Sequence, residues 1–226
     1  MTTSTCPSTE IAARKGTATM KLMTVTNVTV DGVMQGLGGP EEDERGGFER
    51  GGWALPLFDD EVETLLGQVY QRADAFLFGR RTFEVFARSW GTGSWGTDQG
   101  KNPISAALNT RPKYVASSTL TDPQWADTTV LSGDVAAAIA ELKAKPGGEL
   151  QVHGSGALTR SLLAHDLVDE MTLIVVPVVL GQGRRLFPEA GPDIALELVD
   201  SRVDAKGVTT QVFRPAGRPK YAPGTP

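Results

Sequence analysis

Apolar strand patterns and helical patterns alternate along the first part of the chain. Residues 21–30, KLMTVTNVTV, are apolar and β-branched, which favours a strand buried on at least one face. In residues 59–73 apolar side chains recur at helical spacing behind Asp59, a residue type suited to an N-cap, so we predict an amphipathic helix there. A short buried strand at 75–79 runs directly into a second predicted helix at 80–90.

The later part of the chain continues this pattern and then changes character. Further strands are predicted at residues 113–118, 128–133, 149–154, 173–181, 194–203 and 208–215, and further helices at residues 134–144 and 157–167. The alternation of strand and helix predicts an α/β fold built on a mostly parallel sheet. The last three strands follow one another with little helix between them, so we expect them to add antiparallel strands to that sheet.

The segment between the first strand and the first helix, residues 32–57, has a composition that disfavours regular structure. It is rich in glycine and carries an acidic cluster at residues 41–44 together with Phe48 and Trp53. A loop of this length inside a compact domain is usually functional or disordered. Because it holds two large aromatic residues, we interpret it as a lid over a site rather than as a linker.

The two ends of the chain differ in composition from the body. Residues 1–19 are rich in Thr and Ser and lack the apolar stretch of a signal peptide, so we predict a disordered leader, with Met20 as an alternative start. Residues 215–226 are rich in Pro and should form an extended, flexible tail. The body, residues 20–214, fits one domain of ordinary size, since 40% of the chain is hydrophobic.

Composition and charge exclude several classes of function. Twenty-two Lys and Arg against 27 Asp and Glu give a net charge of −5, so we expect no nucleic-acid partner. The longest apolar run, residues 173–180, is far shorter than the roughly 20 residues of a membrane helix, so we expect no membrane partner. Cys6 is the only cysteine, and His153 and His165 are not spaced as a ligand pair. We therefore expect a cytoplasmic protein without a disulfide or a bound metal.

Three segments have the chemistry of a nucleotide site, and each follows a predicted strand. Residues 154–158, GSGAL, combine two glycines that let the backbone approach a ligand with a helix N-terminus whose N–H groups suit a pyrophosphate. Residues 79–82, GRRT, offer two guanidinium groups and a hydroxyl to a phosphate. Residues 117–119, SST, offer hydroxyl groups.

Each of these segments also has a purely structural interpretation. A tight turn accounts equally well for GSG, paired arginines are more often solvated surface, and the serines more often cap a turn. Their shared placement favours a site, because open α/β sheets bind ligands at the carboxyl ends of their strands. The arginine pair, without an acidic residue placed for a ribose diol, favours NADP over NAD.

Five segments, taken in order, resemble one known family. They are VTVDGVMQG, FGRRTFE, the strand ending in SST, LQVHGSGALTRSLL and VDEMTLIVVPVVLGQGRRLF. The set resembles the family that unites dihydrofolate reductase with the reductase domain of the bifunctional riboflavin-biosynthesis enzyme, and in particular its stand-alone bacterial members. The resemblance covers nearly the whole body. It implies a three-layer α/β/α dihydrofolate-reductase-like fold, NADPH as cofactor, a small-molecule substrate and a homodimer.

The resemblance also implies roles for particular residues. Asp31 lies by the nicotinamide and substrate, where we expect a catalytic, orienting role. Thr29, Trp53 and Arg184 are expected to bind substrate, and Arg185 lies in the same loop as Arg184. The residues expected to bind the cofactor are Gly79, Arg80, Arg81, Thr82, Ser117, Ser118, Gly154, Ser155, Gly156 and Ala157.

Several alternatives stay open at this stage. The substrate is 5-amino-6-(5-phosphoribosylamino)uracil, dihydrofolate, or another small ketone or imine, and the zinc-deaminase signature of the bifunctional enzyme is absent. A non-catalytic NADP-binding protein on the same fold is the alternative from another class. The carboxylates in residues 59–63 fit the first turn of a helix better than a proton donor, and His153 fits a packing role. Ser94 lacks the frame of a nucleophile elbow.

Overall fold

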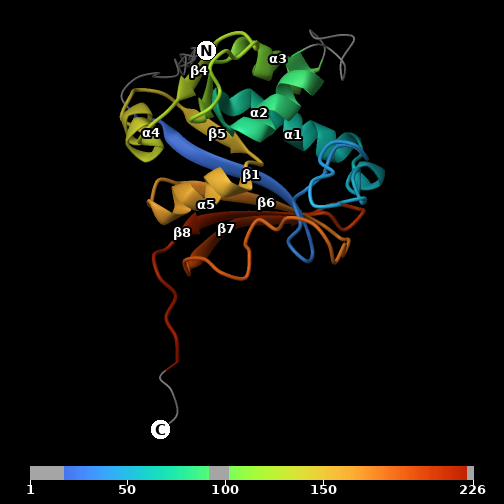
Figure 1. The fold of residues 1–226 in the computed structure, drawn as a ribbon. Helices are drawn as coiled ribbons and strands as arrows, with labels where there is room; N and C mark the ends of the chain where they lie inside the picture. The colour runs from blue at the N-terminus through green and yellow to red at the C-terminus, as the bar shows by residue number, and fades with distance from the viewer. Residues whose placement is uncertain (1–17, 92–101, 223–226) are drawn as a thin grey trace, which may run out of the picture.

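An eight-stranded sheet organises the part of the chain that the computed structural model describes, residues 18–91 and 102–222. Its strands are β1 (Lys21–Thr29), β2 (Ala73–Gly79), β3 (Lys113–Ala116), β4 (Thr128–Leu131), β5 (Glu149–His153), β6 (Glu170–Val176), β7 (Leu196–Val203) and β8 (Thr209–Pro215). Their order across the sheet is β4-β3-β2-β5-β1-β6-β8-β7, with β1 in the middle (Figure 1). Neighbours from β4 to β6 are parallel, whereas β8 is antiparallel to β6 and β7. The predicted mostly parallel sheet with antiparallel C-terminal strands is confirmed.

Three of the five α-helices in the described region begin at a side chain that caps them. The helices are α1 (Asp60–Arg72), α2 (Arg80–Phe86), α3 (Pro103–Thr110), α4 (Val135–Lys143) and α5 (Gly156–Ala164), with a 3₁₀ turn η1 (Leu55–Leu57) and a π-helical turn η2 (Ala87–Gly91) that extends α2. Asp59 caps α1 as predicted. The apolar pattern alone does not predict α3, which begins with Asn102 as its cap and Pro103 in its first turn. This Asn-Pro step is the sequence signal for the helix.

Helices cover both faces of the sheet, because successive strand residues point to opposite sides. Leu77 of β2 packs in a cluster with Ile139 of α4 and Leu162 of α5. Its neighbour Phe78 packs in a cluster on the opposite face, with Leu108 of α3 and with residues of α1 and α2. Figure 1 shows the sheet between these two groups of helices. The expected three-layer α/β/α arrangement is therefore confirmed.

The glycine-rich segment, residues 32–57, is packed against the domain by its aromatic residues. Phe48 and Trp53 are 2% and 9% exposed and share an apolar cluster with Val33. The Trp53 indole N–H also donates to the backbone oxygen of Gln35 at 2.7 Å. Phe48 and Trp53, on which the prediction of a lid is based, therefore anchor this segment to the core. Other residues of the segment face the cavity described below.

The ends of the described region are tied to the sheet. Thr19 forms an isolated antiparallel bridge with Pro146. At the other end β8 includes Pro215, and Ala216 donates its N–H to the Ala195 oxygen, so the first residues of the predicted tail are hydrogen-bonded. Cys6 and Ser94 lie outside the described residues. Among the helices of the described region, none has the length and apolar character needed to span a bilayer.

Candidate functional site

A cavity of about 1570 Å³ lies at the carboxyl ends of the parallel strands. The loops after β2, β3, β4 and β5 line one part of it, and the glycine-rich segment, α1 and the loop at residues 184–188 line the other. All ten residues predicted to bind the cofactor line this cavity, as does Arg184. The structure thus brings together three segments that are far apart in the sequence.

The loop after β5 presents a helix N-terminus to the cavity. Gly154 and Ser155 have φ values of 57° and 51°, so the chain turns sharply into α5. The Ser155 hydroxyl accepts the N–H of Gly79 at 3.0 Å and does not cap its own helix. The N–H groups of the first turn, which starts at Gly156 and Ala157, are therefore available to an anion in the cavity.

The two arginines of the loop after β2 differ in their partners. Arg80 forms an ion pair with Glu84 at 2.7 Å and donates to the hydroxyl of Thr119. Arg81 is exposed, lines the same cavity and forms no hydrogen bond or ion pair with the described residues. Thr82 follows in the first turn of α2 and also faces the cavity. Arg81 therefore keeps its guanidinium available for a phosphate.

The two serines after β3 differ in whether their hydroxyl groups already have partners in the protein. The Ser117 hydroxyl accepts the N–H groups of Thr119 and Leu120 at 3.2 and 3.0 Å, so it caps a turn. Ser118 is exposed beside it and lines the cavity. Turn capping, the structural interpretation of this segment, applies to Ser117, while Ser118 can meet a ligand.

The cavity floor carries polar atoms without partners among the described residues. Thr26 Oγ1 and Asn27 Oδ1 are buried atoms of β1 that make no hydrogen bond there. Both residues line the cavity. A buried acceptor without a donor costs free energy, so these atoms suit a ligand that brings its own N–H or O–H groups.

His153, at the end of β5, is a packing histidine. Its ring stacks on Tyr70 with 3.9 Å between centroids, and Nε2 lies 3.0 Å from Oε1 of Gln151. Burial lowers the pKa of the imidazole from 6.5 to about 3, so the ring is neutral at physiological pH. It shapes the cavity wall without carrying charge.

Asp31 is placed differently from the sequence-based expectation. Its carboxylate accepts the Thr29 hydroxyl at 2.6 Å and the N–H groups of Leu180 and Gly181 at 3.1 and 2.8 Å. The Thr29 bond lowers the pKa of Asp31 most, and together these bonds bring it to about 2. Arg185 donates to the Asp31 backbone oxygen at 2.7 Å. Asp31 thus ties the end of β1 to the loop after β6.

Three of the predicted catalytic and substrate-binding residues do not line the cavity. Thr29 is 1% exposed and bonded to Asp31, and Trp53 is held in the core. The contact of Thr29, Asp31 and Trp53 with substrate therefore stays a prediction that the cavity does not support. In the structure the Asp31 carboxylate and the Trp53 indole are bonded to backbone groups.

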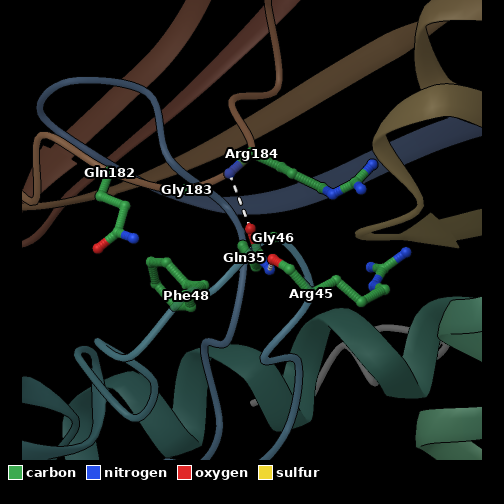
Figure 2. Close-up of a pocket in the computed structure, with 7 residues that line it drawn as sticks. All are labelled: Gln35, Arg45, Gly46, Phe48, Gln182, Gly183 and Arg184. Carbon is green, nitrogen blue, oxygen red and sulfur yellow. Dashed lines mark hydrogen bonds between the residues drawn. The ribbon is translucent and has the colours of Figure 1, made fainter.

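Gln35 lies in the segment VTVDGVMQG, and it is a site residue for which the sequence predicts no role. Its side chain is 4% exposed and bonds to three backbone groups. Oε1 accepts the N–H of Arg184 at 3.0 Å, and Nε2 donates to the backbone oxygens of Asp43 and Arg45 at 3.0 and 2.9 Å. Figure 2 shows the side chains of Arg45 and Arg184 extending to the same side of Gln35. One buried amide therefore sets the backbone positions of two arginines that line the large cavity.

A smaller pocket of about 280 Å³ adjoins Gln35, and Arg45 and Arg184 line it as well. Phe48 and Gln182 line it together with the backbone of Gly183 (Figure 2). The Gln182 side chain donates to the Gly47 oxygen at 2.9 Å. These contacts join the glycine-rich segment to the loop after β6, so both loops form one wall.

Known proteins match most of the length of this chain at low sequence identity. The RibD C-terminal domain family matches residues 20–210. The uncharacterized protein YyaP of Bacillus subtilis (strain 168) is 26% identical over 193 residues, which cover 82% of this chain and 90% of YyaP.

Two solved structures extend the comparison. A putative riboflavin biosynthesis protein from Shewanella sp. PV-4 superposes with a TM-score of 0.65 at 25% identity, covering 87% of this chain and 99% of its own. Dihydrofolate reductase from Enterococcus faecalis, in complex with NADP(H), superposes with a TM-score of 0.54 at 16% identity. The superposition covers 86% of this chain and 96% of the reductase, so the two proteins share a fold. Since the family match spans most of the chain, the protein belongs to the RibD C-terminal domain family, a family of reductases.

Proposed function

We propose that the protein is an NADPH-dependent reductase that transfers hydride to a small heterocyclic, carbonyl or imine substrate. The observation that carries this proposal is a cavity that joins four strand-end loops to a wall of acidic and basic side chains. Its volume of about 1570 Å³ exceeds the roughly 300–1,000 Å³ of an ordinary ligand pocket, which suits a dinucleotide together with a substrate.

The chemistry of the donor groups fits NADPH. The open first turn of α5 suits the pyrophosphate, because N–H groups and the helix dipole favour an anion there. Arg81, with Arg80 and Ser118 beside the same cavity, suits the 2′-phosphate. When bound, the reduced nicotinamide supplies hydride, and the protein holds it in place and excludes water. The unpaired Asn27 Oδ1 is an acceptor for an amide or amino group at the cavity floor.

The leading substrate in this proposal is 5-amino-6-(5-phosphoribosylamino)uracil. Family membership and the riboflavin-biosynthesis name of the Shewanella relative favour it. The exposed side chain of Arg184 beside the cavity suits an anionic substituent such as a phosphate, whereas the guanidinium of Arg45 is already ion-paired with Asp43. Dihydrofolate is the second candidate and a small ketone or imine is the third. A non-catalytic NADP-binding protein is the alternative function, since it would need the same cofactor loops.

Two measurements on the purified protein test the proposal. Titration with NADPH and with NADH, followed by quenching of the four tryptophans, should saturate with a clear preference for NADPH. Loss of NADPH absorbance should then accompany addition of 5-amino-6-(5-phosphoribosylamino)uracil or dihydrofolate. NADPH binding without turnover of any small ketone, imine or heterocycle would favour the non-catalytic alternative, and absence of binding would contradict both.

A further inference from the structure

Glu42, in the glycine-rich segment, has a carboxyl group set into the cavity wall. Its Oε2 accepts the backbone N–H of Gly38 at 2.8 Å. Gly38 leaves the space that this carboxyl fills, since a Cβ at Gly38 would overlap Oε2. Glu42 and Gly38 both line the large cavity. The acid is therefore held in one place by the backbone of its own loop.

The other carboxylates that line the cavity have different surroundings. Burial raises the pKa of Asp43, but its hydrogen bonds and ion pair with Arg45 outweigh burial and hold that pKa below its usual value. Asp60 and Glu63 lie in the first turns of α1 with exposed side chains. Among the carboxylates of the described residues around this cavity, Glu42 alone combines partial burial with a raised pKa.

The charges around Glu42 act in opposite directions. Burial raises its pKa most, and the negative charge of Asp43 raises it further. The N–H groups of Gly38 and Leu37 and the positive charge of Arg88 in η2 lower it, and the net direction is upward. Such an acid holds a proton more readily than an exposed glutamate, and the backbone N–H groups stabilise the carboxylate left after the proton has gone.

We propose that Glu42 is the proton donor of the reduction, an inference that rests on the proposed function. The substrate carbon of a C=N or C=O bond takes hydride from the reduced nicotinamide, which becomes oxidised. The O–H bond of the Glu42 carboxylic acid breaks, and a new N–H or O–H bond forms on the neighbouring substrate atom. Solvent entering the cavity then returns a proton to the Glu42 carboxylate. Glu42 thus acts as a catalytic residue from the loop, whereas Asp60 and Glu63 of α1 keep the role of helix-start carboxylates.

The first test measures the proton on Glu42 without any turnover. Protein labelled with ¹³C at the glutamate carboxyl carbons is titrated by NMR, and the Glu42 signal is the one that disappears in Glu42→Gln. We expect its midpoint above the roughly 4.3 of a free glutamate. In Gly38→Ala the added methyl displaces the carboxyl from its place, so the midpoint should move back toward that value. A Glu42 midpoint at or below the free value overturns the inference, whatever the protein reduces.

The second test separates proton donation from binding. With 5-amino-6-(5-phosphoribosylamino)uracil or dihydrofolate, whichever the wild type reduces, Glu42→Gln should lower kcat about 10²- to 10⁴-fold at unchanged NADPH affinity. The wild-type kcat/KM should fall as pH rises through the Glu42 midpoint, and this pH dependence should vanish in the variant. Glu41→Gln removes one charge from the exposed neighbouring residue and should keep wild-type turnover.

The outcomes distinguish this inference from the proposed function. An active wild type with an equally active Glu42→Gln overturns the role of Glu42 and leaves the reductase intact. A wild type that binds NADPH and reduces no ketone, imine or heterocycle overturns the proposed function and the role of Glu42 with it. Loss of turnover in Glu42→Gln together with loss of NADPH binding assigns Glu42 to structure and contradicts proton donation.

Discussion

The hydroxyl of Ser155 accepts the backbone N–H of Gly79 at 3.0 Å, and this bond joins the loop after β5 to the end of β2. Ser155 has a φ of 51°, in the left-handed region that favours glycine. Ser155→Ala should lose the bond and keep the strain, whereas Ser155→Gly should lose the bond and relieve the strain. We therefore expect Ser155→Ala to have a free energy of unfolding about 1 kcal/mol lower than that of Ser155→Gly. Urea unfolding of the two variants measures this difference, and equal midpoints and slopes would contradict it.

Gln35 should affect the substrate end of the cavity more than the cofactor end. Gln35→Leu leaves the N–H of Arg184 and the backbone oxygens of Asp43 and Arg45 without their buried partner. We expect a loss of stability on the order of 2–3 kcal/mol and a raised KM for substrate, with NADPH affinity nearly unchanged. Gln182→Leu removes a single, less buried bond to Gly47 and serves as the matched control. Equal effects of the two variants on KM would refute a special role for Gln35.

Arg81 and Arg80 should contribute unequally to cofactor choice. Arg80 shares its charge with Glu84, while Arg81 has no such partner among the described residues. A charge-assisted bond to a phosphate is worth about 1.5–3 kcal/mol, so Arg81→Ala should weaken NADPH binding about tenfold or more and leave NADH binding nearly unchanged. Arg80→Ala should have a smaller effect. Fluorescence titration of both variants with both cofactors measures this, and a larger effect of Arg80→Ala would reverse the assignment.

The ionised carboxylate of Asp31 should stabilise the fold, and this contribution should be lost in acid. Its bonds to the Thr29 hydroxyl and to two backbone N–H groups lower its pKa from 3.8 to about 2. A lowered native pKa stabilises the fold above the unfolded-state pKa, near 3.9, and that contribution is lost as the pH falls through about 2. Asp31→Asn should therefore be less stable than wild type at about pH 5, with the gap narrowing between about pH 4 and pH 2. A gap that stays constant over that range would contradict the ionic role of Asp31.

The turnover of Asp31→Asn is a separate question. If Asp31 orients nicotinamide or substrate, as the family resemblance implies, kcat should fall in the variant at a temperature where the fold is intact. Unchanged kcat would assign the residue to tying β1 to the loop after β6, the role that its hydrogen bonds favour.

The edge strand β7 is the surface on which a homodimer is expected. All its residues are exposed, and Leu198 and Val203 are 53% and 66% exposed. Single charges on an apolar edge strand oppose pairing. If two copies pair through this strand, Leu198→Glu should convert a dimer to a monomer in size-exclusion chromatography with light scattering. Arg202→Glu, at an exposed polar position of β7, is the control, and a purely monomeric wild type would contradict the homodimer.

The layers of the fold follow from local signals, and so they are predictable. Asp59 caps α1, and β-branched runs such as residues 21–30 form strands, because those preferences act over a few neighbouring residues. β6 ends just before Pro177, although the apolar run extends to residue 180, because proline lacks the N–H that a central strand needs. The strand predicted at residues 173–181 therefore extends past the end of β6.

The site is less predictable, since its residues are defined by partners far along the chain. Trp53 lies in a glycine-rich loop, where an aromatic side chain indicates a lid. In the structure it belongs to the same apolar cluster as Val33, and its indole N–H donates to the backbone oxygen of Gln35. Glu42 lies in none of the segments that resemble the family, and Gln35 lies in VTVDGVMQG without a predicted role. Their roles appear only once the loops at residues 35–45 and 180–186 lie together, which no periodicity in the sequence specifies.

The central place of β1 has a consequence for how the chain reaches this state. The first strand of the described region pairs with β5 and β6, whose residues follow it only after β2, β3 and β4. During synthesis both edges of β1 stay unpaired until the second half of the chain has been made. The contacts of β1 with β5 and β6 therefore join residues far apart in the sequence, and we expect folding to be slow. The loop after β5 reaches its place only when β5 pairs with β1, which is also late. The loops proposed to hold the cofactor therefore come together only in the fully assembled protein, and a cofactor that binds them would shift the population toward that form by mass action.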